Sequence, residues 1–309
     1  MSSKEIVVIS CASGKQATPL IYFLAKNPYR LRLVVHSTSS QQRLQKSYPE
    51  ADVRTAELTN PSVCQEIIKD ANIVYHIGPS LHPHETAIGC NMIDAAKSTP
   101  SVKHFIYSSV LNSQLRKLMN HDCKRYVEEY LMESELPYTI LCPTHFMDVL
   151  PIPMFLKQME ENREGALVFP AMWNPDIKFS FLSLQDFAEA AFTVIKGQEK
   201  HFRAKYDIVS TKPLSYNEVL KKVGDVLGRE IKAEQKPYGT SVSMFGARVF
   251  GGKIDGADPA MVDGLERLLL YYNRHGLQGN PNVLEWLIGR KPTSHEEWAK
   301  GVLGELKKA

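Results

Sequence analysis

The stretch from Glu5 to Leu24 constrains the fold of this chain more than any other. It reads EIVVISCASGKQATPLIYFL: an apolar, β-branched run, then small and polar residues, then apolar side chains that recur at helical spacing. This order predicts a buried strand, a tight turn and a helix. The first N–H groups of such a helix lack partners and can bind an anion above the turn, as in dinucleotide-binding folds.

The turn follows the glycine pattern of dinucleotide-binding proteins only in part. Cys11, Gly14 and Ala17 stand at the positions of a Gly-x-x-Gly-x-x-Gly spacing. Gly14 permits close approach of the backbone to a phosphate, and Ala17 still permits the helix to pack on the strand. A Cβ at Cys11 costs about 1–2 kcal/mol if φ must be positive there. A strand–turn–helix without a ligand would have the same pattern. The residues predicted around the pyrophosphate are Cys11, Ser13, Gly14, Lys15 and Gln16.

The end of the second predicted strand bears on the choice of cofactor. An acidic residue at this place binds the ribose hydroxyls of NAD and repels the 2′-phosphate of NADP. The residues that follow the strand contain no acid. They therefore favour NADP(H), although an ordinary polar loop would have the same composition. The residues predicted near the 2′-phosphate are His36, Ser37, Thr38 and Ser39.

Strand and helix patterns alternate through the first half of the chain. This alternation predicts an α/β fold: a doubly wound parallel sheet of the Rossmann type with a second, smaller, mainly helical domain. The NADP(H)-binding domain is expected at residues 1–150 plus roughly 176–210, and the substrate-binding domain at 151–175 and 211–309. Gly78 follows the fourth predicted strand, where the nicotinamide half of a dinucleotide would cross the sheet edge.

Composition argues against several classes of protein. The net charge is +3, and no basic run with interleaved aromatic residues indicates a nucleic-acid partner. Five cysteines without a Cys-x-x-Cys spacing indicate reduced thiols and a cytoplasmic protein, with no metal site. No apolar run reaches the about 18 residues that a membrane span needs. The N-terminus lacks the pattern of a signal peptide.

Several stretches along nearly the whole chain carry a resemblance to a known family. They are the opening turn, Asn91–Ala96, His104–Val110, His121–Glu128, Tyr138–Met147, Tyr272–Leu277 and Leu287–Thr293. Together they resemble the NmrA-like family of atypical short-chain dehydrogenases/reductases. That family includes both NADP(H)-dependent reductases and non-catalytic redox sensors. The resemblance implies that Lys124 binds the nicotinamide ribose.

The departures from the family pattern concern the chemistry. Short-chain dehydrogenases place a tyrosine four residues before the lysine, and here Asn120 precedes Lys124 at that spacing. Asparagine cannot donate a proton at a useful pKa, so a histidine with an ordinary pKa of about 6.5 is the better donor. His145 is favoured because it follows the sixth strand, whereas His121 could face solvent at its helix start. The predicted catalytic residues are His145, Lys124 and His121.

The segment from residue 150 to residue 173 is rich in proline, methionine and aromatic residues. It fits a lid or pocket wall for an apolar ligand, and ordinary core packing is the alternative for each of its residues. The residues predicted to contact substrate are Ser109, Phe146, Met147, Met154, Phe155 and Trp173.

Three functions of different classes follow. The first is an NADP(H)-dependent reductase of a bulky, partly aromatic carbonyl or enone, a small-molecule substrate typical of secondary metabolism. The second is a non-redox isomerase, cyclase or lyase on the same scaffold. The third is a non-catalytic NADP(H)-sensing regulator that binds a protein partner. The resemblance implies Leu-Arg-Pro at the end of the sixth strand, and here Cys142 replaces the arginine, so one cation near the site is lost. Cys11, Asn120 and Cys142 favour the latter two functions, and the hydrophobic segment favours an enzyme. The family resemblance places the reductase first.

Overall fold

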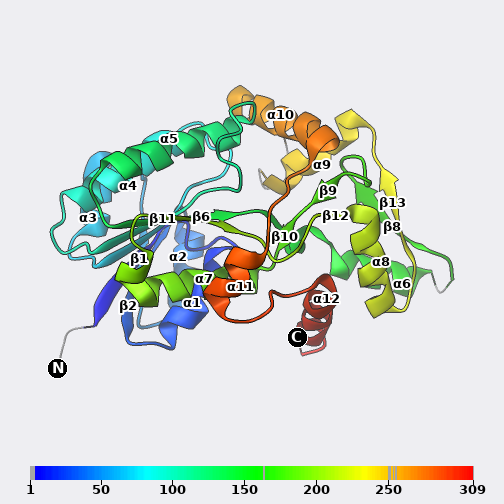
Figure 1. Cartoon of the computed structure of the whole chain (residues 1–309), viewed down its shortest axis with the longest axis horizontal. Helices are drawn as coiled ribbons and strands as arrows, with labels where there is room; N and C mark the ends of the chain where they lie inside the picture. The colour runs from blue at the N-terminus through cyan, green and yellow to red at the C-terminus, as the bar shows by residue number, and fades with distance from the viewer. Residues whose placement is uncertain (1–3, 163, 250–251, 253, 255, 309) are drawn as a thin grey trace. The chain divides into compact units, whose positions relative to one another are not determined.

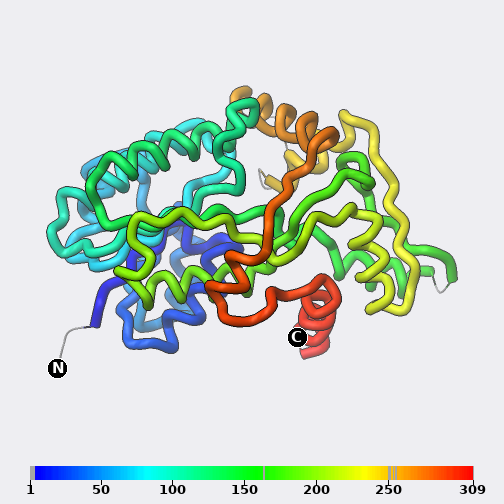
Figure 2. The backbone as a smooth tube through the Cα atoms, in the orientation of Figure 1, coloured from blue at the N-terminus to red at the C-terminus, as the bar shows by residue number. Residues whose placement is uncertain are grey.

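The chain forms two compact units. The computed structural model describes residues 4–162, 164–249, 252, 254 and 256–308, and Figure 2 traces them from blue to red. Unit 1 comprises Met1–Arg116, Asn120–Pro143 and Phe187–Asp207, and unit 2 comprises Lys117–Met119, Thr144–Asp186 and Ile208–Ala309. Unit 1 therefore contains the predicted cofactor-binding turn.

Unit 1 is built on a seven-stranded sheet of order β11-β6-β5-β4-β1-β2-β3. The neighbouring pairs from β6 to β3 are parallel, which confirms the predicted Rossmann-type sheet. The strands are β1 (Glu5–Ile9), β2 (Tyr29–Val35), β3 (Asp52–Thr55), β4 (Ile73–Ile77), β5 (His104–Ser108), β6 (Tyr138–Pro143) and β11 (Ala204–Ile208).

Helices cover both faces of this sheet. Figure 1 shows α3, α4 and α5 over one face and α1, α2 and α7 over the other. Rings of Phe23 and Phe192 stack 5.8 Å apart and join α1 to α7. Asn60 caps α3 by accepting a hydrogen bond from the Ser62 amide, ahead of a proline in the first turn. The bounds are α1 (Ala17–Ala25), α2 (Thr38–Ser47), α3 (Pro61–Ile68), α4 (Glu85–Lys97), α5 (Met119–Glu133), α7 (Leu184–Gly197) and the 3₁₀ turn η2 (Gln198–His201).

The strand order reverses at β1. This strand pairs with β2 on one side and β4 on the other, and Val7, Val8 and Ile9 are fully buried. In an open parallel sheet, ligands bind in the crevice outside the carboxyl ends of the strands at such a reversal. The sheet edge at the carboxyl ends of β1 and β4 is therefore where a functional site is expected.

Helices α4 and α5 pack closely because α4 carries a glycine at their contact. A Cβ built on Gly89 would lie 2.6 Å from a methyl group of Val127. The Thr86 hydroxyl donates a hydrogen bond to the Cys123 carbonyl oxygen over 3.2 Å, and the Tyr130 hydroxyl reaches the Asp94 carboxylate over 2.8 Å. These contacts fix the separation of the two helices.

Unit 2 is mainly helical, as predicted, with short strand pairs. Strands β8 and β13 run side by side in a parallel ladder, visible in Figure 2 as the green and yellow segments. A capping box between Ser215 and Glu218 begins α8. The elements are β7 (His145–Phe146), η1 (Met147–Val149), α6 (Ile152–Glu161), β8 (Leu167–Ala171), β9 (Lys178–Phe179), β10 (Phe181–Leu182), β12 (Leu214–Ser215), α8 (Tyr216–Leu227), β13 (Ile231–Gln235), α9 (Tyr238–Val249), α10 (Pro259–His275), α11 (Asn282–Ile288) and α12 (His295–Leu306).

We expect Gly89→Ala to destabilise the protein although alanine favours helix. The added methyl overlaps Val127, and overpacking of this kind costs about 1–3 kcal/mol, more than the gain in helix propensity of about 1 kcal/mol. Urea unfolding measures the difference in free energy of unfolding. The double variant Gly89→Ala/Val127→Ala should recover most of it. Equal stability of Gly89→Ala and wild type would contradict this account of the helix contact.

Candidate functional site

The turn after β1 keeps the conformation that normally calls for glycine. Cys11 has φ of +48°, so this chain holds a side chain in the left-handed region. The Gly14 amide donates to the Cys11 carbonyl oxygen over 2.9 Å, and a Cβ on Gly14 would lie 3.1 Å from that oxygen. Ala17 is fully buried at the start of α1. The turn therefore keeps its shape without the first glycine.

A buried hydroxyl ties the turn to the neighbouring strand. The Ser10 hydroxyl lies 2.9 Å from Nδ1 of His76, donates to the Ile77 carbonyl oxygen and accepts from the Ile77 amide. Burial lowers the pKa of His76 to about 3, so this imidazole is neutral. At the other side of the turn, the Ser108 hydroxyl donates to Oε1 of Gln16 over 2.9 Å. The ends of β1, β4 and β5 are thus linked to the start of α1.

One of the hydroxyl groups that follow β2 forms a hydrogen bond with the backbone at the start of α2. Ser37 caps α2, because its hydroxyl accepts from the Ser40 amide over 3.3 Å and also lies 3.1 Å from the Ser39 hydroxyl. His36 and Thr38 are exposed at this edge. The segment is therefore a capped helix start whose outer polar groups face solvent.

A buried ion pair occupies the carboxyl end of β4. Glu85, the first residue of α4, pairs with Lys124 of α5, and only 1% and 8% of their side chains are exposed. Oε2 of Glu85 also accepts from the Cys123 thiol over 3.6 Å. A Cβ built on Gly78 would lie 2.8 Å from Oε1 of Glu85, so the carboxylate rests against the end of the strand. Burial is the largest single effect and disfavours the charged form of Lys124, but the effects that favour it, led by Glu85, together raise the pKa of the lysine.

The sequence reasoning missed Glu85. The available signal was helical spacing: Glu85 precedes Ile88, Gly89 and Met92 by three, four and seven residues, and all three are buried. An acid on the apolar face of a helix needs a buried partner. The partner comes from 39 residues further along the chain and could not be identified from spacing.

The two thiols beside this pair are protonated. Burial, with Glu85 second, raises the pKa of Cys11 to about 11 and that of Cys123 to about 12. Both groups are therefore weak hydrogen-bond donors and poor nucleophiles at neutral pH.

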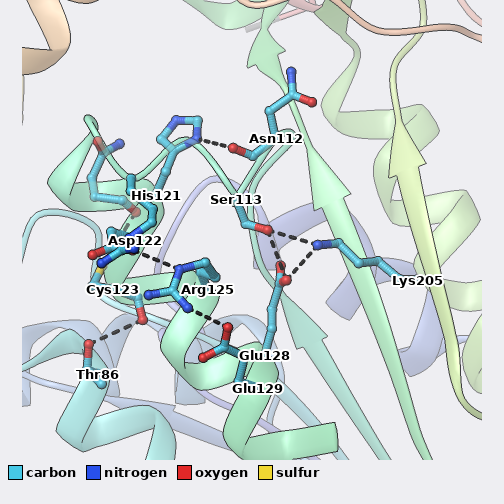
Figure 3. Close-up of polar contacts among 12 residues, drawn as sticks. Thr86, Asn112, Ser113, His121, Asp122, Cys123, Arg125, Glu128, Glu129 and Lys205 are labelled. Atoms are coloured by element: carbon cyan, nitrogen blue, oxygen red, sulfur yellow. Dashed lines mark hydrogen bonds and ion pairs between the residues drawn. The ribbon is translucent and has the colours of Figure 1, made fainter.

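His121 lies on the same face of α5 as Lys124, three residues earlier, and is fully buried. The expectation that it could face solvent is wrong, because residues 109–113 cover the start of the helix. Its Nδ1 lies 3.1 Å from the Asn112 carbonyl oxygen, which can only accept, so Nδ1 carries the proton (Figure 3). Burial lowers the pKa of His121 to about 4, and Lys124 adds to this effect.

A second buried carboxylate holds the segment that covers His121. Glu128 accepts a hydrogen bond from the Ser113 hydroxyl and pairs with Lys205 over 2.6 Å (Figure 3). It also accepts a hydrogen bond from the Ser109 hydroxyl. Lys205 also donates to the Ser113 hydroxyl over 2.8 Å. Ser109, predicted to contact substrate, is buried and its hydroxyl is bonded to Glu128. The Ser109 hydroxyl therefore holds the protein segment in place, and its proton is not available to a substrate.

His145 belongs to unit 2, where aromatic rings surround it. Its Nε2 lies 2.5 Å from the Tyr216 hydroxyl, and its ring lies 5.1 Å from that of Phe179 and 5.5 Å from that of Trp173. Burial lowers its pKa to about 3, and Arg248 adds to this effect. The sequence reasoning assumed an ordinary pKa for this group. The structure differs because segments distant in sequence exclude water from the imidazole.

The remaining residues predicted to contact substrate are also in unit 2. Met147 and Phe155 are fully buried and Trp173 nearly so, which is the core packing that the sequence left open. Phe146 and Met154 are half-buried.

Metal binding and membrane insertion find no support in the described part of the chain. No group of three or more His, Cys, Asp or Glu side chains within it could hold a metal ion. Among the same residues, no helix combines the length and apolar character that a bilayer span requires.

The parallel sheet, the tight turn before α1 and the reversal of strand order at β1 define a Rossmann-type fold. The sequence pattern of the NmrA-like family matches residues 2–297. The chain belongs to the NmrA-like family.

Proteins of different function resemble this chain. The nitrogen metabolite repression protein nmrA of Emericella nidulans is 25% identical over 244 residues, which cover 76% of this chain and 69% of that protein. A crystal structure of NmrA, a negative transcriptional regulator, in complex with NAD matches with a TM-score of 0.77 and 21% identity over 100% of this chain and 99% of that one. An NADPH-dependent quinone oxidoreductase from Escherichia coli, complexed with NADPH, matches with a TM-score of 0.74 and 20% identity over 96% and 99%.

We expect the cost of the left-handed turn to depend on the side chain at position 11. Cys11→Val should destabilise the protein by about 1–3 kcal/mol, because a β-branched residue tolerates positive φ poorly. Cys11→Gly should stay within about 1 kcal/mol of wild type, since relief of strain offsets the greater entropy of the unfolded chain. Chemical denaturation measures both. If Cys11→Val were as stable as Cys11→Gly, the backbone at position 11 would not be strained by a side chain.

His145 should contribute to loss of stability in acid. Its pKa is about 3 in the folded protein and about 6.5 when unfolded, so the unfolded state binds the extra proton. The contribution is complete above about pH 6.5 and is lost as pH falls toward 3. We expect His145→Gln to flatten the decline in unfolding free energy below pH 6.5 by up to about 1.4 kcal/mol per pH unit. Urea unfolding at several pH values measures this dependence. If the unfolding free energies of variant and wild type fell in parallel with pH, the prediction would be refuted.

Proposed function

We propose that this protein is an NADP(H)-dependent reductase of a bulky, partly aromatic small molecule, a carbonyl conjugated to an alkene or ring. The observation that carries the proposal is the buried ammonium of Lys124 at the carboxyl end of β4, held in its charged form by Glu85. A fixed cation at this edge suits the cofactor ribose and negative charge that develops on a substrate oxygen.

The cofactor fits the turn by the criteria of close approach and charge. Gly14 has no side chain that would hinder the approach of a phosphate, and Lys15 and the N-terminus of α1 supply positive charge. His36, Thr38 and Ser39 at the exposed end of β2 would accept the 2′-phosphate, since no acid stands among them. When bound, NADPH supplies a hydride.

The protonation states of the two histidines limit which hydride acceptors the proposed site could reduce. Asn120 replaces the usual tyrosine, and His121 and His145 are neutral at working pH because their pKa values are about 4 and about 3. Neither imidazole delivers a proton readily at neutral pH. A conjugated acceptor spreads the negative charge that hydride transfer creates and can take its proton from water. We therefore place Lys124 first among the predicted catalytic residues. His121 donates its one proton to the Asn112 carbonyl oxygen and so has no N–H group left to offer a substrate oxygen.

A non-catalytic NADP(H) sensor is the second candidate. The missing tyrosine and the low histidine pKa values favour it, and the curated relative is a repression protein. A sensor would bind the cofactor and report through a protein partner. A non-redox isomerase, cyclase or lyase would use Lys124 without a nicotinamide cofactor.

Nucleotide binding and turnover separate these candidates. The purified protein is titrated with NADPH and NADH and then assayed for NADPH oxidation with aromatic enones and quinones. Binding with turnover supports the reductase, and binding without turnover supports the sensor. If neither nucleotide binds, the reductase and the sensor are both excluded.

We expect Lys124→Met to lower kcat about 10²–10³-fold, because it removes the fixed cation. His145→Phe should lower kcat less than about 3-fold if His145 only packs among aromatic rings, and about 10²–10⁴-fold if it transfers the proton. Steady-state rates with saturating NADPH distinguish the two roles of His145 and measure the loss in Lys124→Met. Unchanged turnover in Lys124→Met would refute the assignment.

Cofactor choice should follow the charge after β2. We expect His36→Asp to weaken NADPH binding at least about 10-fold and leave NADH binding nearly unchanged, because an acid there repels the 2′-phosphate. Isothermal titration measures both. The exposed His275 of α10 provides a matched control, His275→Asp, which should affect neither nucleotide. Equal losses for NADPH and NADH in His36→Asp would contradict the predicted site.

A further inference from the structure

The ion pair between Glu85 and Lys124 lies where the two redox forms of the cofactor differ. In a doubly wound sheet the pyrophosphate sits over the turn after β1, and the nicotinamide half crosses toward the strands beyond the reversal. The first strand beyond it is β4, which ends at Ile77, and Gly78 follows directly. This inference rests on the proposed cofactor binding, and it concerns which redox form is preferred.

The geometry brings two opposite charges to this strand end. Gly78 has no side chain, and a Cβ there would lie 2.8 Å from Oε1 of Glu85. The carboxylate therefore fills the space above the strand end, with the ammonium of Lys124 bound to it. Both groups are buried, so solvent screens them little.

The nicotinamide ring changes charge between its redox forms: it is a cation in NADP⁺ and neutral in NADPH. A nearby carboxylate stabilises the oxidised ring, and a nearby ammonium destabilises it. We propose that Glu85 and Lys124 together set the relative affinity of the site for the oxidised and reduced cofactor, Glu85 favouring NADP⁺ and Lys124 favouring NADPH.

Single neutral substitutions test the two opposite effects. Dissociation constants for NADP⁺ and NADPH are measured near neutral pH for wild type, Glu85→Gln and Lys124→Met. Glu85→Gln should raise the ratio of the NADP⁺ constant to the NADPH constant at least about 10-fold, because an uncompensated cation then faces the ring. Lys124→Met should lower the same ratio. Shifts of the ratio in opposite directions would identify an electrostatic effect of the two charges. If the variants acted only by breaking their mutual contact, both would shift the ratio in the same direction.

The double variant Glu85→Gln/Lys124→Met lacks both charges of this pair and should return the ratio to within about 3-fold of wild type. If Glu85→Gln does not fold, comparison of Lys124→Met with the double variant isolates the same carboxylate. Asp94→Asn is the matched control, because Asp94 also links α4 to α5 but lies exposed near the end of α4. It should leave the ratio unchanged.

The outcomes separate this inference from the function on which it rests. Shifts of the same sign in both single variants, or ratios that stay within about 2-fold of wild type, overturn the role of the pair while cofactor binding stands. Failure of the wild-type protein to bind either nucleotide overturns the proposed function and this inference together.

Discussion

The candidate site depends on the position of β1 inside the parallel sheet of unit 1. Because β1 pairs with β2 on one side and β4 on the other, the turn with Gly14 and the Gly78 that follows β4 lie at the same edge of the sheet. The hydroxyl of Ser10 reinforces this arrangement by bonding across to β4. Any change that moved β1 to an edge would separate the groups assigned to the two halves of the cofactor.

Unit 1 neutralises its two buried carboxylates by the same means. Glu85 pairs with Lys124, and Glu128 pairs with Lys205, each across segments far apart in sequence. Breaking a buried pair leaves an uncompensated charge, which costs about 3–5 kcal/mol. The first pair lies at the strand end and carries charge into the site. The second holds the segment over His121 and fixes which imidazole nitrogen bears the proton.

The sequence was sufficient for features that depend on neighbouring residues. Continuous apolar runs located the strands, and Asn60 with Pro61 marked the start of α3. The conflict between Cys11 and a glycine turn was also visible, although only the structure gives its outcome, a positive φ. Partners distant in sequence could not be predicted. Glu85 was missed, and the pKa of His145 was misjudged, because the groups that surround each come from other parts of the chain.

The protonated thiols beside the ion pair bear on what the site can tolerate. Conjugated carbonyl compounds are electrophiles that alkylate thiolates, and a protein that binds them risks covalent modification. Cys11 and Cys123 escape this risk, since burial and Glu85 hold their pKa values at about 11 and about 12. The carboxylate that we assign to the discrimination of redox forms thus also adds to the burial that keeps these two thiols protonated.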